Sequence, residues 1–303
     1  MIQLLKSLLC QTLDKKFYEI IIVDNNSNDN TREVVKKYTD LPENNIKYVL
    51  EKSRGLHFSR HTGARVANSE IFAYTDDDSI VDKRWLEELL KIYEDEKIGC
   101  AGGKVIIKWD EKPPLWIIPY ENVLGRLDYG PNFCILNSNE YINGANFSIR
   151  KKILYEVGGF NPDQIGEVLV GDGETGLCNK IRKKGIKIAW VPDAIVWHLQ
   201  IVSKNATLSD MKRRFANNGI CVEYAYYRKR KLNKFQLAKS SFRSFVYFVG
   251  YKLFALLKKL MKNNRWRFYE LSSAYYISRA SYKLKLIYNK NLREFVLKEK
   301  WLK

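Results

Sequence analysis

The chain has 303 residues, 46% of them hydrophobic and 28% charged, so it can bury one large core or two smaller ones. Its formal charge of +18 is unevenly placed: residues 204–303 hold 25 Lys and Arg against 5 Asp and Glu, whereas residues 1–203 hold 27 against 29. The five cysteines are scattered without a CxxC pair, which argues against a zinc site or a disulfide framework and indicates a reducing cytosol. A near-neutral body followed by a basic region whose partners carry phosphate is therefore predicted.

Strands and helices alternate in the first quarter of the chain. We predict helices at 2–13, 31–39 and 55–70, and strands at 18–23, 45–51 and 71–75. The first helix is too short for a signal peptide or a membrane span. Largely apolar strands between helices predict an α/β fold with a mostly parallel sheet covered on both faces. Ligands of such sheets bind beyond the carboxyl ends of the strands, where the turns at Asp24 and Asp76 both lie.

The middle of the chain is mixed, and its end is helical. A helix near 83–94 and a strand at 98–107 precede long loops rich in Trp, Pro, Tyr and Gly over 109–142. A strand, a turn and a short helix fill 142–160, an acidic loop leads into a basic helix over 171–185, and a strand pair follows at 186–198. Basic helices are predicted from about 207 onward. We therefore predict two domains, an α/β body over residues 1–203 and a basic helical region over residues 204–303.

Three consecutive aspartates follow the strand at 71–75. Alternate residues of an extended segment point the same way, so Asp76 and Asp78 aim together while Asp77 points aside. Two carboxylates on one edge suit Mg²⁺ or Mn²⁺, which take further ligands from water and from substrate phosphates. The alternative is a solvated turn without a cation.

Two other segments carry polar residues that suit a nucleotide. Asp24 ends the strand at 18–23, is followed by Ser27, and could accept hydrogen bonds from a base or a sugar; alternatively it forms a local turn. Arg60, on the helix before the aspartates, is a cation suited to a diphosphate, or else belongs to a solvated helix face.

Six segments in this order resemble the family 2 glycosyltransferases of surface-polysaccharide type, which have a GT-A fold: VDNNSNDNT, GLHFSRHTGA, FAYTDDDS, NGANFSIRKKILYEVGGF, GDGETGL and VPDAIVWH. The resemblance covers about residues 2–200. It implies inverting, metal-dependent transfer from a nucleotide-diphosphate sugar to a hydroxyl of a glycan or lipid-linked acceptor. Asp24 resembles the aspartate that reads the base, and the nucleotide-sugar site also takes Ser27, Arg60, Asp76 and Asp77. Asp76 and Asp78 resemble the metal-binding DxD, and His198 resembles a histidine that completes the metal or diphosphate site.

The resemblance also implies a general base, usually in a Glu-Asp motif just before a helix. Here the segment reads Gly171-Asp172-Gly173-Glu174, which departs from that pair. Counting back from the helix aligns Glu174 with the base of the family, and Asp172 serves if the loop shifts. Both residues remain candidates.

A second departure concerns the start of the chain. Members of the family begin with an apolar strand and a Pro-Thr-Tyr-Asn-like turn, whereas this sequence begins at the helix that should follow them. We therefore expect a sheet that lacks its central first strand, and either a start upstream of Met1 or a truncated form. In the truncated case the alternative function is a non-catalytic nucleotide-sugar-binding or scaffold subunit.

The basic region contains an apolar stripe at helical spacing, flanked by Lys252, Lys258, Lys259 and Lys262. Its members are Phe242, Phe245, Val246, Val249, Leu253, Leu256, Leu257 and Leu260. The run is too short to span a bilayer, so the helix either lies in the interface of an anionic membrane or packs on the catalytic body. No nucleic-acid motif is recognised, so nucleic acid is not predicted as a partner. The expected location is cytoplasmic, peripheral on the inner face of the cell membrane.

Overall fold

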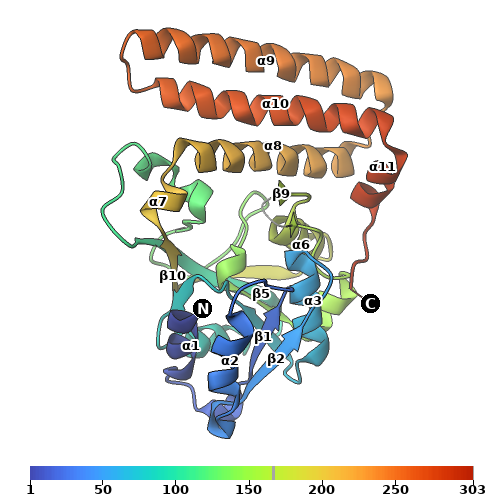
Figure 1. Cartoon of the computed structure of the whole chain (residues 1–303). Helices are drawn as coiled ribbons and strands as arrows, with labels where there is room; N and C mark the ends of the chain where they lie inside the picture. Colours follow the sequence, from blue (N-terminus) through green and yellow to red (C-terminus); the bar gives the residue numbers. More distant parts are fainter. Residues whose placement is uncertain (166–167, 303) are drawn as a thin grey trace. The chain divides into compact units, whose positions relative to one another are not determined.

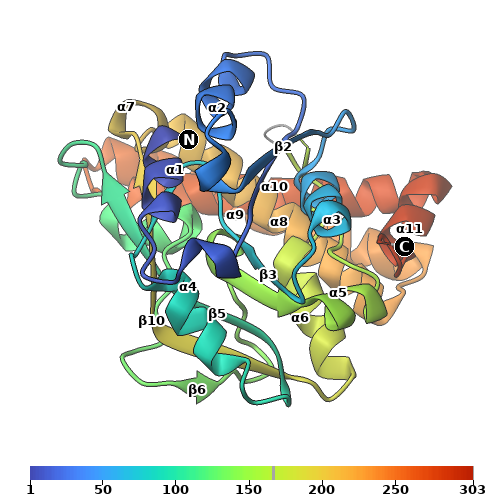
Figure 2. The ribbon, with the colours of Figure 1, turned by 90° about the horizontal axis from the view of Figure 1, so that it is seen from below.

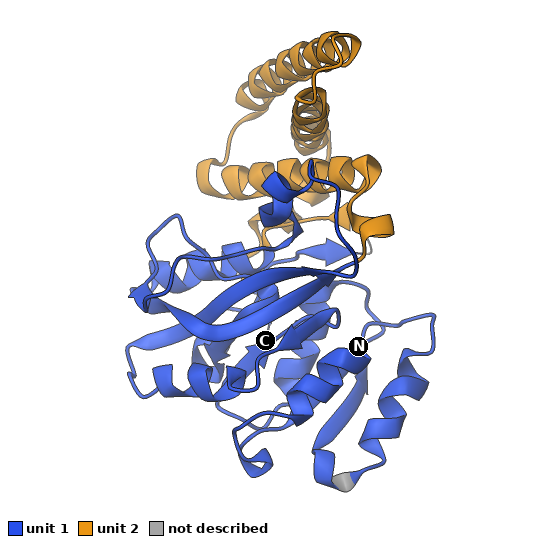
Figure 3. Cartoon of the chain, turned by 90° about the vertical axis from the view of Figure 1, so that its left-hand side faces the viewer, with its two compact units in different colours: residues 1–166, 173–200, 300–303 blue, residues 167–172, 201–299 orange. Residues whose placement is uncertain are grey.

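The computed structural model describes residues 1–165 and 168–302, and the chain forms two compact units, coloured separately in Figure 3. The first unit comprises Met1–Gly166, Gly173–Gln200 and Lys300–Lys303, and the second Glu167–Asp172 and Ile201–Glu299. The division after Gln200 lies close to the boundary predicted at 203. The last residues belong to the first unit because Leu302 is buried in its core and the Trp301 N–H donates to the Gly158 carbonyl at 2.8 Å.

The first unit alternates strands and helices as predicted for its first quarter. Its helices are α1 (Ile2–Leu9), α2 (Thr31–Thr39), α3 (Leu56–Val66), α4 (Trp85–Ile92), α5 (Lys151–Glu156) and α6 (Gly173–Lys183). Its strands are β1 (Ile20–Asp24), β2 (Ile46–Leu50), β3 (Ile71–Tyr74), β4 (Ser79–Val81), β5 (Ile98–Trp109), β6 (Cys134–Ile135), β7 (Phe147–Arg150), β8 (Gln164–Ile165) and β10 (Lys187–Gln200). Short 3₁₀ turns cover Lys15–Phe17, Pro42–Asn44, Ile118–Leu124 and Gly144–Asn146.

The strand pair expected at 186–198 is instead one long strand, β10. Its register against β5 shifts between Val191 and Val196. Pro192 lies in that interval and has no N–H to donate to a neighbouring strand, which accounts for the irregularity.

The sheet is mixed rather than mostly parallel, which corrects one part of the predicted fold class. Its strand order is β3-β7-β5-β10-β4, with β6 also paired to β10. β5 and β10 are parallel, but β7 runs antiparallel between β3 and β5, and β4 and β6 run antiparallel to β10. β1 and β2 form a separate parallel pair. β1 and β3 thus belong to different sheets.

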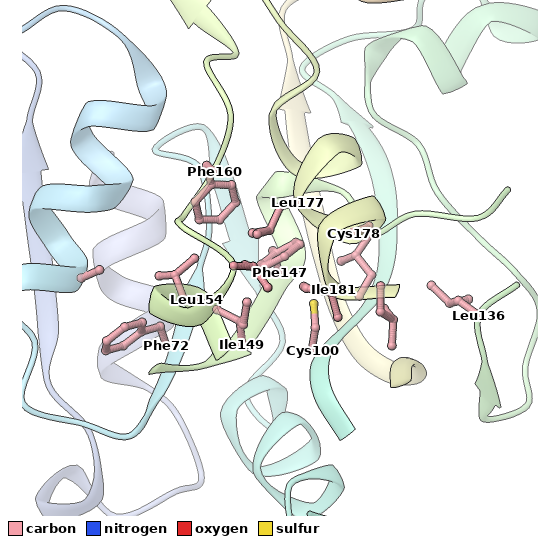
Figure 4. Close-up of a cluster of buried hydrophobic side chains, with 14 of the residues drawn as sticks. Phe72, Cys100, Leu136, Phe147, Ile149, Leu154, Phe160, Leu177, Cys178 and Ile181 are labelled. Atoms are coloured by element: carbon pink, nitrogen blue, oxygen red, sulfur yellow. The ribbon is translucent and has the colours of Figure 1, made fainter. Parts of the chain in front are cut away.

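Helices cover the six-stranded sheet on both faces, as the prediction required. Neighbouring residues of a strand point to opposite faces, and β10 shows this plainly. Trp190 joins the core cluster of Figure 4, which contains Leu154 of α5 and Leu177 of α6. Its neighbour Ala189 joins a second cluster, to which α1 and α4 contribute; Figure 2 shows α4 beside β5. Burial of both faces stabilises the strands that carry the candidate site.

The second unit is helical apart from β9 (Val168–Leu169). Its helices are α7 (Val202–Asn205), α8 (Leu208–Arg230), α9 (Lys234–Leu260), α10 (Trp266–Tyr288) and α11 (Lys290–Leu297). α10 packs against both α8 and α9 (Figure 1). Side-chain caps begin the two long helices on either side of it: Thr207 accepts from the Asp210 N–H before α8, and Asn233 and Gln236 form a capping box before α9.

Among the residues that the structure describes, no helix combines the length and the hydropathy needed to cross a membrane.

Candidate active site

Asp76, Asp78 and His198 come together at the end of the six-stranded sheet. The two aspartates lie on the connection between β3 and β4, and His198 lies on β10, where it pairs with Ser79 of β4. One ligand atom from each of the three side chains lies within 4.8 Å of the others. Asp76 and Asp78 thus aim at one point as expected, but they do so from a turn, in which the Ser79 N–H donates to the Asp76 carbonyl at 3.1 Å, and not from the extended segment that was predicted. β10 supplies a third donor from more than a hundred residues later in the chain.

The imidazole of His198 is oriented by the backbone. Its Nδ1 lies 2.9 Å from the Leu124 carbonyl, and because a carbonyl oxygen only accepts hydrogen bonds, Nδ1 carries the proton. Nε2 then faces Oδ1 of Asp78 at 3.1 Å. Two acceptor atoms at that distance require a positive charge between them, either a proton or a metal ion. A histidine whose second nitrogen donates to a backbone carbonyl is the usual arrangement of a metal ligand.

Burial and neighbouring charges shift the pKa values of these three side chains. Burial raises the pKa of Asp76 to about 6; the positive charge of Arg60 opposes this rise, and the negative charge of Asp78 adds to it. Burial alone would raise the pKa of Asp78 and lower that of His198, but their mutual hydrogen bond reverses both directions. Two carboxylates and an imidazole are a donor set that Mn²⁺ and Mg²⁺ accept, so these residues fit the expected ion.

Asp77 lies outside this group of donors. Its side chain is exposed, and its backbone carbonyl accepts a hydrogen bond from the amino group of Met1. Partial burial and the adjacent charge of Asp78 raise the pKa of its carboxyl group. Asp78 is exposed as well, so the difference between the aspartates is that only Asp76 and Asp78 belong to the group of possible ligands with His198.

A buried ion-pair group surrounds the candidate base. Nη1 of Arg60 lies 2.8 Å from Asp163 and 3.4 Å from Glu174, and the guanidinium stacks on the ring of Phe160 at 4.9 Å. Arg60 is only 6% exposed, and its charge also acts on Asp76. Gly144 allows this approach: a Cβ at that position would lie 2.1 Å from Nη2 of Arg60.

The two candidate bases have different surroundings. Glu174 lies in the first turn of α6; its Oε2 faces Arg60, its Oε1 faces the N–H of Gly144 at 3.4 Å, and its side chain is 24% exposed. Asp172 belongs to the second unit and is buried, and its charge adds to the burial that raises the pKa values of Tyr224 and Tyr282. Glu174 is partly exposed and its charge acts on Asp76, whereas Asp172 is buried and its charge acts on tyrosines of α8 and α10.

Asp24 and Ser27 form a turn at the end of β1. Asp24 accepts hydrogen bonds from the Tyr48 hydroxyl at 2.6 Å and from the Ser27 N–H at 2.8 Å. Burial would raise the pKa of Asp24, but these donors hold it below its usual value. This is the local turn that the sequence offered as the alternative, and the turn lies at the carboxyl end of its strand, where the sequence placed it.

Several site residues were not found from the sequence. Asp163 follows Asn-Pro in a loop that reads like any turn, Gly144 stands in a segment noted only for its resemblance, and Leu124 contributes through its carbonyl alone. None of these positions carries a local signal, because each acts through partners at least 30 residues away.

Comparison with known proteins gives the family of the chain. The family described as glycosyl transferase family 2 matches residues 1–158. Glycosyltransferase AglE of Haloferax volcanii is 23% identical over 64% of this chain and 60% of its own length. A glucosyl-dolichyl phosphate glucuronosyltransferase of the same organism is 26% identical over 64% of this chain and 62% of its own length. The chain thus spans less than two thirds of these relatives.

Solved structures give the fold. The mannosyltransferase PcManGT from Pyrobaculum calidifontis, in complex with GDP-Man and Mn²⁺, superposes with a TM-score of 0.59 over 94% of this chain and 82% of its own, at 19% identity. GalNAc-T7 with UDP, GalNAc and Mn²⁺ superposes with a TM-score of 0.52 over 76% of this chain and 48% of its own, also at 19% identity. The fold is therefore that of GT-A glycosyltransferases. Because the family match covers more than half of the chain, the protein belongs to glycosyl transferase family 2.

Proposed function

We propose that this glycosyltransferase moves a sugar from a nucleotide-diphosphate donor to a hydroxyl of a glycan or lipid-linked acceptor, with inversion at the anomeric carbon. The observation that carries the proposal is the proximity of Asp76, Asp78 and His198 to a partly exposed Glu174, with Arg60 acting on both. Such a site combines groups that can bind the leaving diphosphate with a carboxylate that can accept a proton.

Asp76, Asp78 and His198 are the residues that would hold Mg²⁺ or Mn²⁺. A bound ion supplies charge neutralisation for the leaving diphosphate. The Leu124 carbonyl keeps His198 in the tautomer that presents Nε2 to the site. The proposal of a metal is supported by the facing acceptor atoms of His198 and Asp78.

Glu174 is proposed as the general base. It takes the proton of the acceptor hydroxyl while that oxygen bonds to the anomeric carbon, and the bond from this carbon to the diphosphate breaks on the opposite face. Arg60 and the N–H of Gly144 hold the carboxylate in place without blocking it. Arg60 thus acts as a positioning residue for the base, besides the diphosphate contact expected from the sequence.

The remaining assignments concern the donor and the setting. Asp24 and Ser27, with Asp77, are proposed to contact the nucleotide and its sugar. Among the neighbours, one was solved with GDP-Man, and one relative is named a glucosyl-dolichyl phosphate glucuronosyltransferase. A lipid-linked acceptor would place the enzyme at the inner face of the cell membrane, and nucleic acid has no part in the proposal.

A donor panel tests the proposal. Purified protein with Mn²⁺ is incubated with UDP-, GDP- and dTDP-sugars, and donor hydrolysis and thermal shift are measured. Glu174→Gln should lower turnover by roughly a hundredfold or more while donor binding stays unchanged, the range for removal of a general base. Asp172→Asn is the matched control and should lower it less.

Two results would change the assignment. A larger loss in Asp172→Asn would move the base to that residue. Donor binding by thermal shift without turnover in the wild type, on any donor and with any acceptor, would favour the non-catalytic binding subunit.

A further inference from the structure

Helix α9 packs on α10 through small side chains and through the rings of Tyr247, Tyr251 and Phe254, which contact tyrosines of α10. Leu237, Ser241, Ser244 and Ala255 are the buried residues of this 27-residue helix. Ser241 donates to the Ala280 carbonyl at 2.9 Å, and Ser244 accepts from Lys283 at 2.8 Å. These residues recur at helical spacing, so they define the face that α9 turns toward α10.

The opposite face of α9 carries the large apolar side chains. At 100° per residue, Phe242, Val246, Leu253, Leu257 and Leu260 lie opposite the packed face. They are between 52% and 73% exposed. The helix thus leaves a face of large apolar side chains outside its contact with α10, unlike a helix whose apolar face is buried in a soluble core. A contiguous apolar face of this kind marks a surface that something covers.

Charge identifies the kind of partner. No Asp or Glu occurs between Glu223 and Glu270, an interval that contains the whole of α9 and the turn after it. Lys239, Arg243 and Lys262 are exposed there. Lys252 is different, because it is paired with Glu270 of α10 at 2.6 Å and belongs to the helix–helix contact. An apolar stripe edged by cations complements an anionic bilayer surface, where acyl chains receive the stripe and headgroup phosphates receive the cations.

We propose that α9 docks in the plane of an anionic membrane, with the face of Phe242, Val246, Leu253, Leu257 and Leu260 (the α9 outer face) in the headgroup–acyl boundary. The helix lies on the bilayer rather than across it. The proposal deepens the suggested setting at a membrane, but it rests on the second unit alone. Vesicle binding and donor turnover are measured separately, so either can fail without the other.

Cosedimentation with vesicles tests the docking. The full chain is mixed with phosphatidylcholine vesicles that contain a third phosphatidylserine, and with pure phosphatidylcholine vesicles, at 50 mM and 500 mM salt. Binding should require phosphatidylserine and should fall steeply at high salt, where the Debye length is short. Equal binding to both vesicles, or binding to neither, would overturn the proposal.

Two triple variants separate charge from apolar contact. Lys239→Glu, Arg243→Glu and Lys262→Glu together should weaken binding by about a hundredfold or more, given the usual contribution of each cation near an anionic leaflet. Their matched control is Lys36→Glu, Lys37→Glu and Lys112→Glu on exposed residues of the first unit, which should bind much more like the wild type.

Leu253→Gln, Leu257→Gln and Leu260→Gln together should weaken binding at least tenfold without loss of helical signal, because all three are exposed in the folded unit. Leu90→Gln, Leu115→Gln and Phe133→Gln are the control, also exposed but in the first unit. Unchanged vesicle binding in the α9 variant would overturn the assignment of this face. The assignment would also be overturned if the wild type is a dimer that binds no vesicles and the α9 variant is a monomer. The partner of this face would then be a second copy of the chain.

Discussion

His61 should make the first unit sensitive to acid. It lies on α3, is 1% exposed, and its Nε2 accepts a hydrogen bond from the Phe160 N–H at 2.9 Å. This nitrogen must stay unprotonated to accept. Burial, together with the neighbouring charges of His57 and Arg65, lowers the pKa of His61 to about 3.

The sign and size of the effect follow from linkage. In the unfolded chain the pKa of His61 is about 6.5, whereas in the folded protein it is about 3. The contribution of His61 to stability is therefore complete above pH 6.5 and is lost as the pH falls toward 3. For these two values the free energy of unfolding should fall by about 2 kcal/mol between pH 7.5 and pH 5. Asp76, whose pKa is raised to about 6, acts in the opposite direction over part of this range. A comparison with a variant is therefore needed.

The assay is denaturant unfolding of the wild type and of His61→Gln at pH 7.5, 6.5, 5.5 and 5. Glutamine offers a side-chain oxygen to the Phe160 N–H and does not titrate. All other groups are shared by the two proteins, so the difference between their free energies of unfolding isolates His61. That difference should shrink by about 2 kcal/mol on acidification. Parallel pH profiles for the two proteins would refute the reasoning.

Three further outcomes are expected. Asp76→Asn or Asp78→Asn should abolish turnover while circular dichroism shows an intact fold. Each variant should weaken nucleotide-sugar binding only when metal is present. Full activity of the wild type in EDTA would contradict the metal role. Gly144→Ala should lower turnover because its Cβ would displace Arg60. The control is Gly63→Ala, where the Cβ meets only Val23 at 3.5 Å; it should leave turnover unchanged and leave stability unchanged or slightly raised, because Gly63 lies in a helix. Leu302→Ala should lower the free energy of unfolding by about 2–4 kcal/mol, measured with urea, because Leu302 is 2% exposed in the core of the first unit; no change would mean that the chain end is not held there.

Features that depend on neighbouring residues could be predicted from the sequence. The helix at 31–39 has the bounds predicted for it, since turn residues and periodicity are local signals. The spacing of Asp76 and Asp78 marked them as a pair of ligands, although a turn closed by the Ser79 N–H and the Asp76 carbonyl brings them together, and not an extended backbone. The sheet, by contrast, is mixed, because the strand that separates β3 from β5 comes from Phe147–Arg150, and no local pattern states which strands become neighbours.

The site and the exposed helix face were decided by the tertiary structure. The ion pair between Arg60 and Asp163 and the contact of His198 with the Leu124 carbonyl join segments that are far apart in the sequence. Glu174 and Asp172 can be compared as candidate bases only when their surroundings are known. In α9 the periodicity marks an apolar stripe, but the same stripe could face the protein or face away from it. Packing turns it outward, because Ser241, Ser244 and Ala255 allow α10 to approach the other face closely. Contacts between distant segments depend on how the whole chain folds, and this cannot be predicted from the interactions between neighbouring residues in the sequence.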